Sequence, residues 1–160
     1  TMNSQFADLL DFTQHDLNAN RRGRLTDRQR AHLQMQRDAT SALYSTGAGL
    51  LIGLAAVCIG LTQTASKFYV ELLFVIPTAF LLAYIIQLWI NFTLDLRARR
   101  VDAVSGCALA QPILRVQTRL HIGSLNFALS DRVARAFQNG SAYRVYYARR
   151  SKTILSVEPV

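Results

Sequence analysis

Two uncharged stretches decide the fold of this chain: ATSALYSTGAGLLIGLAAVCIGLTQTAS at residues 39–66 and LLFVIPTAFLLAYIIQLWINFTL at residues 72–94. They are 28 and 23 residues long. A helix needs about 20 predominantly apolar residues to cross the hydrocarbon core of a bilayer. Because both stretches exceed that length, we predict two transmembrane helices. This pattern excludes a disordered chain, a disulfide scaffold and a single soluble globule.

The distribution of positive charge predicts the orientation of these helices. The chain has 18 Lys and Arg against 10 Asp and Glu, for a net charge of +8. Several arginines precede the first stretch and three more follow the second, whereas Lys67 is the one basic residue in the short connection. Lys and Arg concentrate on the cytoplasmic side of membrane proteins. We therefore predict a multi-pass protein of the bacterial inner (plasma) membrane with both termini in the cytoplasm.

The segments that flank the membrane helices predict two different structures. Residues 1–40 form a cytoplasmic helical hairpin, in which residues 4–15 are amphipathic and Thr26 with Gln29 forms a capping box. Residues 41–93 form the transmembrane hairpin. Residues 94–160 form a small cytoplasmic β domain, because apolar and polar residues there alternate with a period of two.

The β domain is predicted to have the order β-β-β-α-β-β. A first short strand at residues 101–105 ends at Gly106, and residues 114–122 alternate strictly as a half-buried strand. Ser130 caps a short helix that Asn139 and Gly140 end. This order is typical of the five-stranded OB barrel, and an SH3-like or other small barrel is the alternative. The predicted fold class is therefore an α+β membrane protein with a small OB-like β-barrel.

Small residues recur along one side of the first apolar stretch. Such residues let two helix backbones approach closely within lipid. The alternative interpretation is that glycine is simply common in membrane helices. We predict a packing face, against either the second stretch or a neighbouring copy, made of Ser45, Gly49, Gly53, Ala56 and Gly60. In the second stretch, Pro77 is predicted to kink the helix.

The sequence contains no motif that predicts catalysis or a cofactor. It lacks a P-loop, a GxSxG motif and any Cys/His pair with zinc spacing. Asp16, Asn18 and Asn20, followed by Asp27, have part of the spacing of a calcium loop, but Arg21 occupies the position that requires glycine. We therefore predict a chain that is not an enzyme and that has no catalytic, cofactor or metal site.

Two clusters of basic residues predict contact with an anionic surface. A basic segment beside a membrane helix is attracted to anionic lipid headgroups. A nucleic acid is the less favoured partner, although OB folds stack bases on aromatic residues beside cations, because Tyr143 and Tyr147 share the face that fills the core. The predicted contact residues are Arg97, Arg99, Arg100, Arg149, Arg150 and Lys152.

Several segments together resemble known membrane proteins. These are DLNANRRGRLT at residues 16–26, the two-span segment, YRVYY at residues 143–147 and ILSVE at residues 154–158. They resemble a group of uncharacterised bacterial two-span membrane proteins with a small C-terminal β domain. In architecture the chain is also similar to the NfeD family, whose members partner stomatin-like membrane scaffolds. The resemblance implies a partner in a membrane complex and no activity.

These features predict a non-enzymatic membrane scaffold or accessory subunit. It would assemble as a homo-oligomer, or within a membrane complex, through the small-residue face and the β-barrel. One alternative is a homo-oligomeric channel or transport component in which Pro77 kinks a pore-lining helix. Another is a module that binds anionic lipid or nucleic acid.

Overall fold

The computed structural model describes residues 2–61, 67–114 and 117–160, and it divides into two compact units. One unit combines Thr1–Ala31 with Asp95–Val160, and the other is His32–Leu94. The first unit contains both helices and strands, and we call it the α+β unit. It is built from both ends of the chain, whereas the second unit is a pair of helices.

Three short helices and the ends of two long ones belong to the α+β unit. They are α1 (Met2–Leu10), α2 (Gln14–Arg21), the start of α3 (Asp27–Leu61), the end of α4 (Lys67–Ala98) and α5 (Asp131–Ala134). The predicted helix at residues 4–15 is two helices, because Asp11 has a φ of 50° and Thr13 forms its own capping box with Asp16. The predicted capping box of Thr26 and Gln29 is present at the start of α3.

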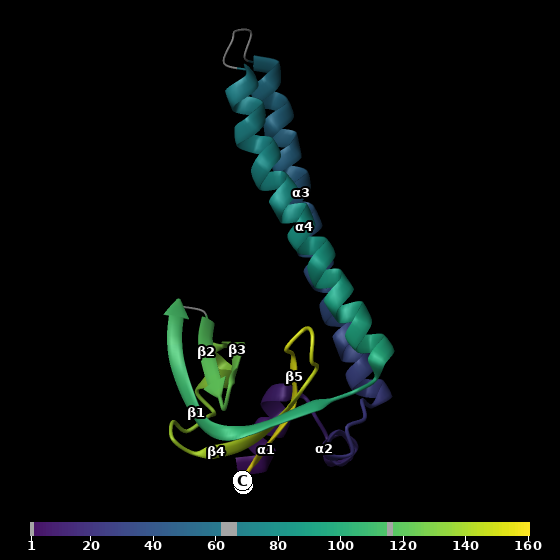
Figure 1. Cartoon of the computed structure of the whole chain (residues 1–160), viewed down its shortest axis with the longest axis vertical. Helices are drawn as coiled ribbons and strands as arrows, with labels where there is room; N and C mark the ends of the chain where they lie inside the picture. Colours follow the sequence, from purple (N-terminus) through teal and green to yellow (C-terminus); the bar gives the residue numbers. More distant parts are fainter. Residues whose placement is uncertain (1, 62–66, 115–116) are drawn as a thin grey trace. The chain divides into compact units, whose positions relative to one another are not determined.

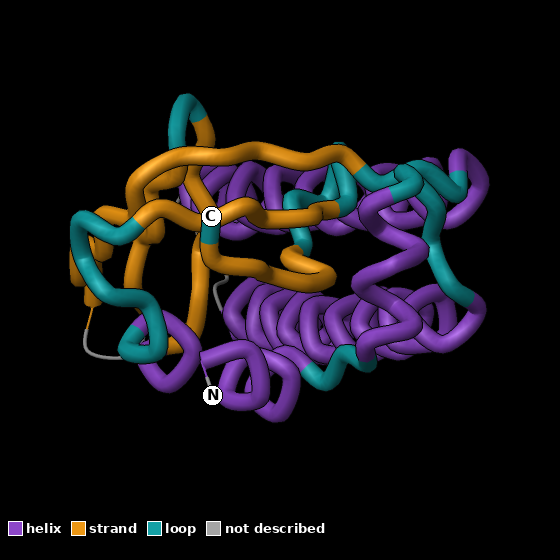
Figure 2. Tube along the Cα trace, turned by 90° about the horizontal axis from the view of Figure 1, so that it is seen from below, coloured by secondary structure: helices purple, strands orange, loops and turns teal. Residues whose placement is uncertain are grey.

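Five antiparallel strands form a curled sheet in the order β3-β2-β1-β4-β5. The strands are β1 (Asp102–Leu114), β2 (Gln117–Ile122), β3 (Leu125–Ser130), β4 (Ala142–Tyr147) and β5 (Ile154–Pro159). The long, curved β1 belongs to two ladders: residues 102–107 pair with β4 and residues 108–114 pair with β2 (Figures 1 and 2). The sheet is therefore a half-barrel, and its elements follow one another in the predicted β-β-β-α-β-β order.

Two predicted strand boundaries are wrong. Gly106 lies inside β1 rather than at the end of a strand, because β1 passes close to the turn between β2 and β3. A Cβ atom at Gly106 would lie 2.6 Å from the backbone nitrogen of Gly123. Glycine at position 106 therefore allows the backbone of the turn to lie close to β1. Leu114 belongs to the end of β1, where it pairs with Gln117, and not to the following strand.

The core of the α+β unit lies inside the curled sheet. The predicted alternation holds in β2, where Leu120 and Ile122 are fully buried and Arg119 is exposed. Helix α1 completes this core, because the Phe6 ring is fully buried with ring centroids 4.8 Å from Phe137 and 5.7 Å from Tyr143. Burying an aromatic side chain of this size stabilises the fold by about 1.5–3 kcal/mol. The N-terminal helix is thus part of the β domain's core.

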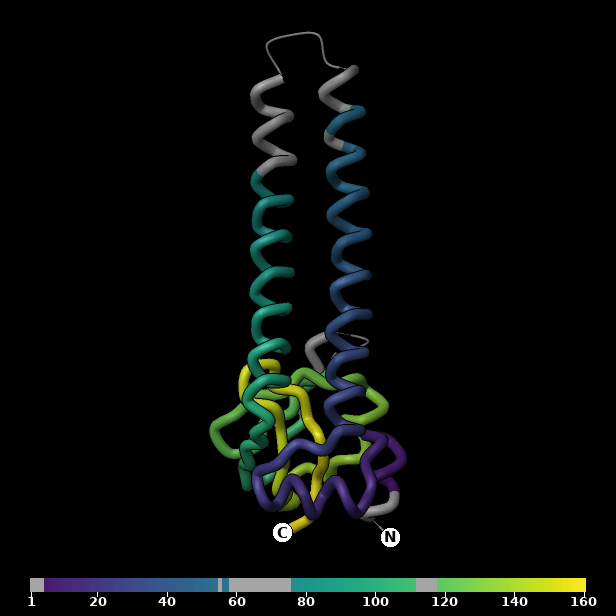
Figure 3. Tube along the Cα trace, turned by 90° about the vertical axis from the view of Figure 1, so that its right-hand side faces the viewer, coloured from purple at the N-terminus to yellow at the C-terminus, as the bar shows by residue number. Residues whose placement is uncertain are grey.

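In the second unit α3 and α4 lie side by side (Figures 1 and 3). The Tyr44 and Tyr84 rings meet edge to face at 5.7 Å, and the Arg37 guanidinium lies 5.7 Å from the centroid of a Trp89 ring. Among the described residues one stretch, Ile76–Ala98 of α4, is long and apolar enough to cross a membrane. The crossing predicted for α3 therefore stays a prediction.

Substituting Gly106 tests the close approach of β1 to the β2–β3 turn. We expect Gly106→Ala to lower the free energy of unfolding by about 1–3 kcal/mol, because the new methyl group meets backbone that cannot move aside. Urea unfolding of the full chain in mild detergent measures this loss. The matched control is Cys107→Ala at the exposed neighbouring position. Equal stability of the two variants would contradict the close approach.

Candidate anionic surface site

A buried carboxylate joins the two predicted clusters of basic residues. Asp95, in the last turns of α4, is 5% exposed. It accepts hydrogen bonds from the backbone nitrogen of Arg150 at 3.0 Å and from that of Ser151 at 2.7 Å. This contact holds the β4–β5 loop against the end of α4. The six predicted contact residues, far apart in sequence, therefore lie on one joined region, and all six are exposed: Arg97, Arg99, Arg100, Arg149, Arg150 and Lys152.

A second contact adds two arginines to this region. Residues 23–25 run antiparallel to residues 99–101: the Leu25 nitrogen donates to the Arg99 oxygen at 3.2 Å, and the Val101 nitrogen donates to the Gly23 oxygen at 3.1 Å. Gly23 has a φ of 70°, which glycine adopts without strain. In the sequence, Arg22 and Arg24 are among the arginines that precede the first apolar stretch and predict its orientation, and they were not predicted to bind an anionic surface. Their position on either side of a turn glycine was the signal that they face solvent with the other cations.

These eight exposed cations form what we call the basic collar: Arg22, Arg24, Arg97, Arg99, Arg100, Arg149, Arg150 and Lys152. Within the described residues, the one ion pair in the collar joins Arg149 Nε to Asp102 Oδ2 at 3.7 Å. An excess of unpaired cations on one surface attracts phosphate-bearing anions. Each Lys or Arg near an anionic membrane surface contributes about 1 kcal/mol, and salt screens the attraction.

Two other arginines of the α+β unit, Arg21 and Arg144, contact a carboxylate within the unit. Arg21 donates to Glu158 Oε2, and the Tyr146 hydroxyl donates to Glu158 Oε1 at 2.7 Å. Burial by itself raises the pKa of the Glu158 carboxyl, but the hydrogen bonds from Arg21 and Tyr146 outweigh burial and lower this pKa below its ordinary value. Arg144 Nη1 lies 3.8 Å from the same carboxylate. This cluster fastens α2 to β5, and its carboxylate does not pair with the cations of the collar.

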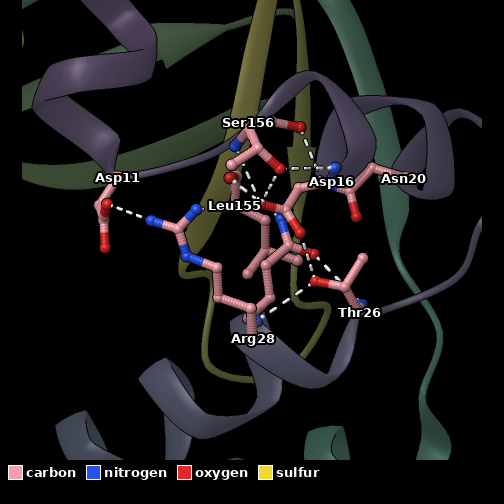
Figure 4. A network of polar contacts seen from close by, with 9 residues as sticks. Asp11, Asp16, Asn20, Thr26, Arg28, Leu155 and Ser156 are labelled. Carbon is pink, nitrogen blue, oxygen red and sulfur yellow. Dashed lines mark hydrogen bonds and ion pairs between the residues drawn. The ribbon is translucent and has the colours of Figure 1, made fainter.

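A second polar network fastens the N-terminal segment to β5 (Figure 4). The Asp16 carboxylate accepts hydrogen bonds from the backbone nitrogen of Thr13 at 2.9 Å and from the Thr26 hydroxyl at 2.5 Å. Burial raises the pKa of Asp16, but these hydrogen bonds from Thr26 and Thr13 lower it overall. The Asn20 amide donates to the Ser156 hydroxyl at 2.8 Å. Both side chains therefore have structural partners.

The four residues with calcium-loop spacing, Asp16, Asn18, Asn20 and Asp27, are in different environments. Asp16 and Asn20 are buried in protein contacts, whereas Asn18 and Asp27 are exposed. Among the described side chains, the structure brings together no group of three His, Cys, Asp or Glu residues that could hold a metal ion.

The predicted small-residue face lies on the exposed side of α3. Ser45, Gly49, Gly53 and Ala56 are exposed, and a Cβ atom at Gly49 or Gly53 would meet nothing within 4 Å. The surroundings of Gly60 lie outside the described part of the structure. Helix α3 instead meets α4 through Arg37 and Tyr44. Pro77 lies within α4 and is exposed; the kink stays a prediction.

Removing the Asp95 carboxylate tests how the collar is held together. We expect Asp95→Ala to cost about 1–3 kcal/mol of stability, because two backbone donors lose their acceptor. The amides of Arg150 and Ser151 should exchange hydrogen faster, as measured by mass spectrometry on the full chain. Asp8→Ala, at an exposed carboxylate, is the matched control. Unchanged exchange at both amides would show that Asp95 does not hold the loop.

The Glu158 cluster predicts a dependence of stability on pH. Because the folded pKa of Glu158 is lowered, its contribution is present above the unfolded value, about 4.3, and is lost as the pH falls through the folded pKa. We therefore expect the melting temperature to fall with acidification below that value, and to fall less steeply in Glu158→Gln. Thermal unfolding followed by circular dichroism measures both. Parallel profiles for the variant and the wild type would contradict this role of Glu158.

Comparison of the chain with protein-family models, curated proteins and solved structures finds no match. The resemblance to bacterial two-span membrane proteins and to the NfeD family therefore stays a prediction. The function of the basic collar is inferred from its own geometry.

Proposed function

We propose that the chain is a non-enzymatic, integral membrane scaffold whose α+β unit binds an anionic membrane surface through the basic collar. The observation that carries this proposal is the pairing of residues 23–25 with residues 99–101. That pairing joins the segment before α3 to the segment after α4, and the paired segments contain the collar residues Arg24, Arg99 and Arg100.

The exposed apolar surface of both helices supports two membrane crossings. In α4, 17% of the candidate span is buried, which favours a helix that faces lipid over the buried core helix of a soluble domain. Phe80 is 73% exposed, and in α3 Leu43 and Leu50 are each 72% exposed. If α4 crosses the bilayer, the pairing of residues 23–25 with residues 99–101 requires that α3 return the chain to the same side. A single crossing would separate the paired segments by the thickness of the membrane.

The charge of the collar supports a cytoplasmic location for the α+β unit. Its cations flank the points where the chain enters α3 and leaves α4, which is the position that basic residues take on the cytoplasmic side. We propose a multi-pass protein of the bacterial inner membrane with both termini in the cytoplasm. The collar would then face the anionic headgroups of that leaflet, and these lipids would be its partners.

The strand order supports an OB-like barrel as the scaffold's soluble part. Strand β1 pairs with both β2 and β4, and α5 follows β3 directly, as in a partly open Greek-key barrel of five strands. Asp16, Asp95 and Glu158 all accept hydrogen bonds from the protein itself, which supports a structural role rather than acid–base catalysis. The exposed small-residue face of α3 supports assembly with a neighbouring copy through Gly49 and Gly53.

Amide exchange in vesicles tests the role of the collar. The full chain is reconstituted into vesicles of phosphatidylcholine alone, or with added phosphatidylglycerol. We expect the anionic lipid to slow exchange in the β4–β5 loop at low salt, and about 1 M salt to remove this protection because the Debye length falls to about 3 Å. The variant Arg149→Gln/Arg150→Gln/Lys152→Gln should lose the protection.

A matched variant controls for the loss of charge. Arg119→Gln/Arg132→Gln/Arg135→Gln removes the same charge from exposed arginines outside the collar, and we expect it to keep the protection. Equal exchange in both kinds of vesicle would contradict the proposal. If a single-stranded oligonucleotide slows exchange in the β4–β5 loop and the anionic lipid does not, the nucleic-acid alternative would be favoured.

A further inference from the structure

Two stretches of the curled sheet's edge carry hydrogen bonds to other parts of the chain. On β5, the Leu155 carbonyl oxygen accepts a hydrogen bond from the Gln29 side chain. On the second half of β1, the Ala110 nitrogen donates to Asn139 Oδ1 at 2.9 Å, and Ala108 exchanges hydrogen bonds with the loop at residues 140–141. Unpaired strand edges are normally protected in this way.

The edge of β3 has no such protection among the described residues. Gly123 and Ser124 form a two-residue turn, so the flanking pair of Ile122 and Leu125 is hydrogen-bonded. The pairs then alternate, and the backbone groups of Asn126 and Ala128 point away from β2. Among the described backbone groups and side chains, no donor or acceptor contacts these groups, and both residues are exposed.

The residues of β3 also lack the features that keep strand edges apart. The segment LNFALS contains no charge and no proline, whereas edges that must stay unpaired usually carry lysine, proline or a bulge. An uncharged strand brings no like charges into register when it meets a second copy of itself. The edge is therefore suited to pairing with the same edge of a second copy. Because the two partners are identical chains, a symmetric arrangement is favoured.

We infer that two copies of the chain pair through the edges of β3, antiparallel and about a two-fold axis at Phe127. In this register Asn126 of one copy lies opposite Ala128 of the other. The two-fold axis makes two such pairs of Asn126 with Ala128, and each pair forms two backbone hydrogen bonds. All the outward backbone groups of these residues are then satisfied. The register also keeps both core faces on one side, because Phe127 lies opposite Phe127 of the second copy. The two half-barrels become one continuous ten-stranded sheet.

This inference deepens the proposed scaffold function and rests on it. A few edge hydrogen bonds alone give a weak dimer, but anchoring in one membrane raises the effective concentration of the two edges. The interface between copies would then lie in the β domain, in addition to the small-residue face of α3.

Disulfide trapping tests the pairing and its register. In the full chain with Cys58 and Cys107 replaced by alanine, Asn126→Cys and Ala128→Cys are made as separate variants with different affinity tags. The paired Cα atoms would be about 5.5 Å apart, within the range of a disulfide. We expect a covalent dimer when the two variants are co-reconstituted and oxidised, and little when either is alone, because like residues are then about 7–8 Å apart. Mixed Arg119→Cys and His121→Cys, on the interior strand β2, are the matched control.

A proline variant separates pairing from folding. In Ala128→Pro the outward N–H group is lost but the ladder with β2 is kept. Introduced beside the cysteine at position 126, it should reduce trapping with the Ala128→Cys partner roughly tenfold, with the melting temperature unchanged. Absence of trapping while the collar is still protected by anionic vesicles would overturn the inference and leave the proposed function intact. Trapping of Asn126→Cys on a different protein would also overturn pairing between copies.

Discussion

The antiparallel contact between residues 23–25 and residues 99–101 is the constraint on which the rest of the structure depends. It closes the chain on itself, so that its two ends fold as one unit although more than 60 residues separate Ala31 from Asp95. It requires the segment between them to leave this unit and return to it. For a chain with apolar helices, this favours an even number of membrane crossings. It also brings Arg22 and Arg24 to the end of α4, where the basic collar forms.

Buried polar groups make this closure specific. Asp16, Asn20 and Glu158 each bind a partner from another segment, and their contacts connect α2 to β5 and to Thr26 just before α3. Breaking one partner of a buried polar pair leaves the other without compensation, so the N-terminal helices cannot shift along β5 without cost. Asp95 has the corresponding role for the β4–β5 loop. The exposed cations are thereby held on a fixed frame while their own charges stay free for a ligand.

The local features of the fold could be predicted from the sequence, and the long-range ones could not. Uncharged runs predicted the two long helices, and alternation around Leu120 and Ile122 predicted the half-barrel's strand order along the chain. Gly106 was misread because its reason is tertiary: the turn at Gly123 passes close to it. Charge alone predicts a shared role for residues 97–100 and 149–152, and that role stays a prediction. Asp95, which joins them, is a lone acid after an apolar run, and nothing local distinguishes it from a surface residue.

The central claim is that the chain enters the membrane from one side and returns to that same side, which a cysteine-accessibility measurement tests directly. In a Cys58→Ala/Cys107→Ala background in intact cells, single cysteines are placed at Gln5, at Lys67 and at Val160. An impermeant maleimide should label the cysteine at position 67 from outside, and label those at positions 5 and 160 only after the membrane is opened. Labelling of positions 5 and 160 from opposite sides would contradict the account.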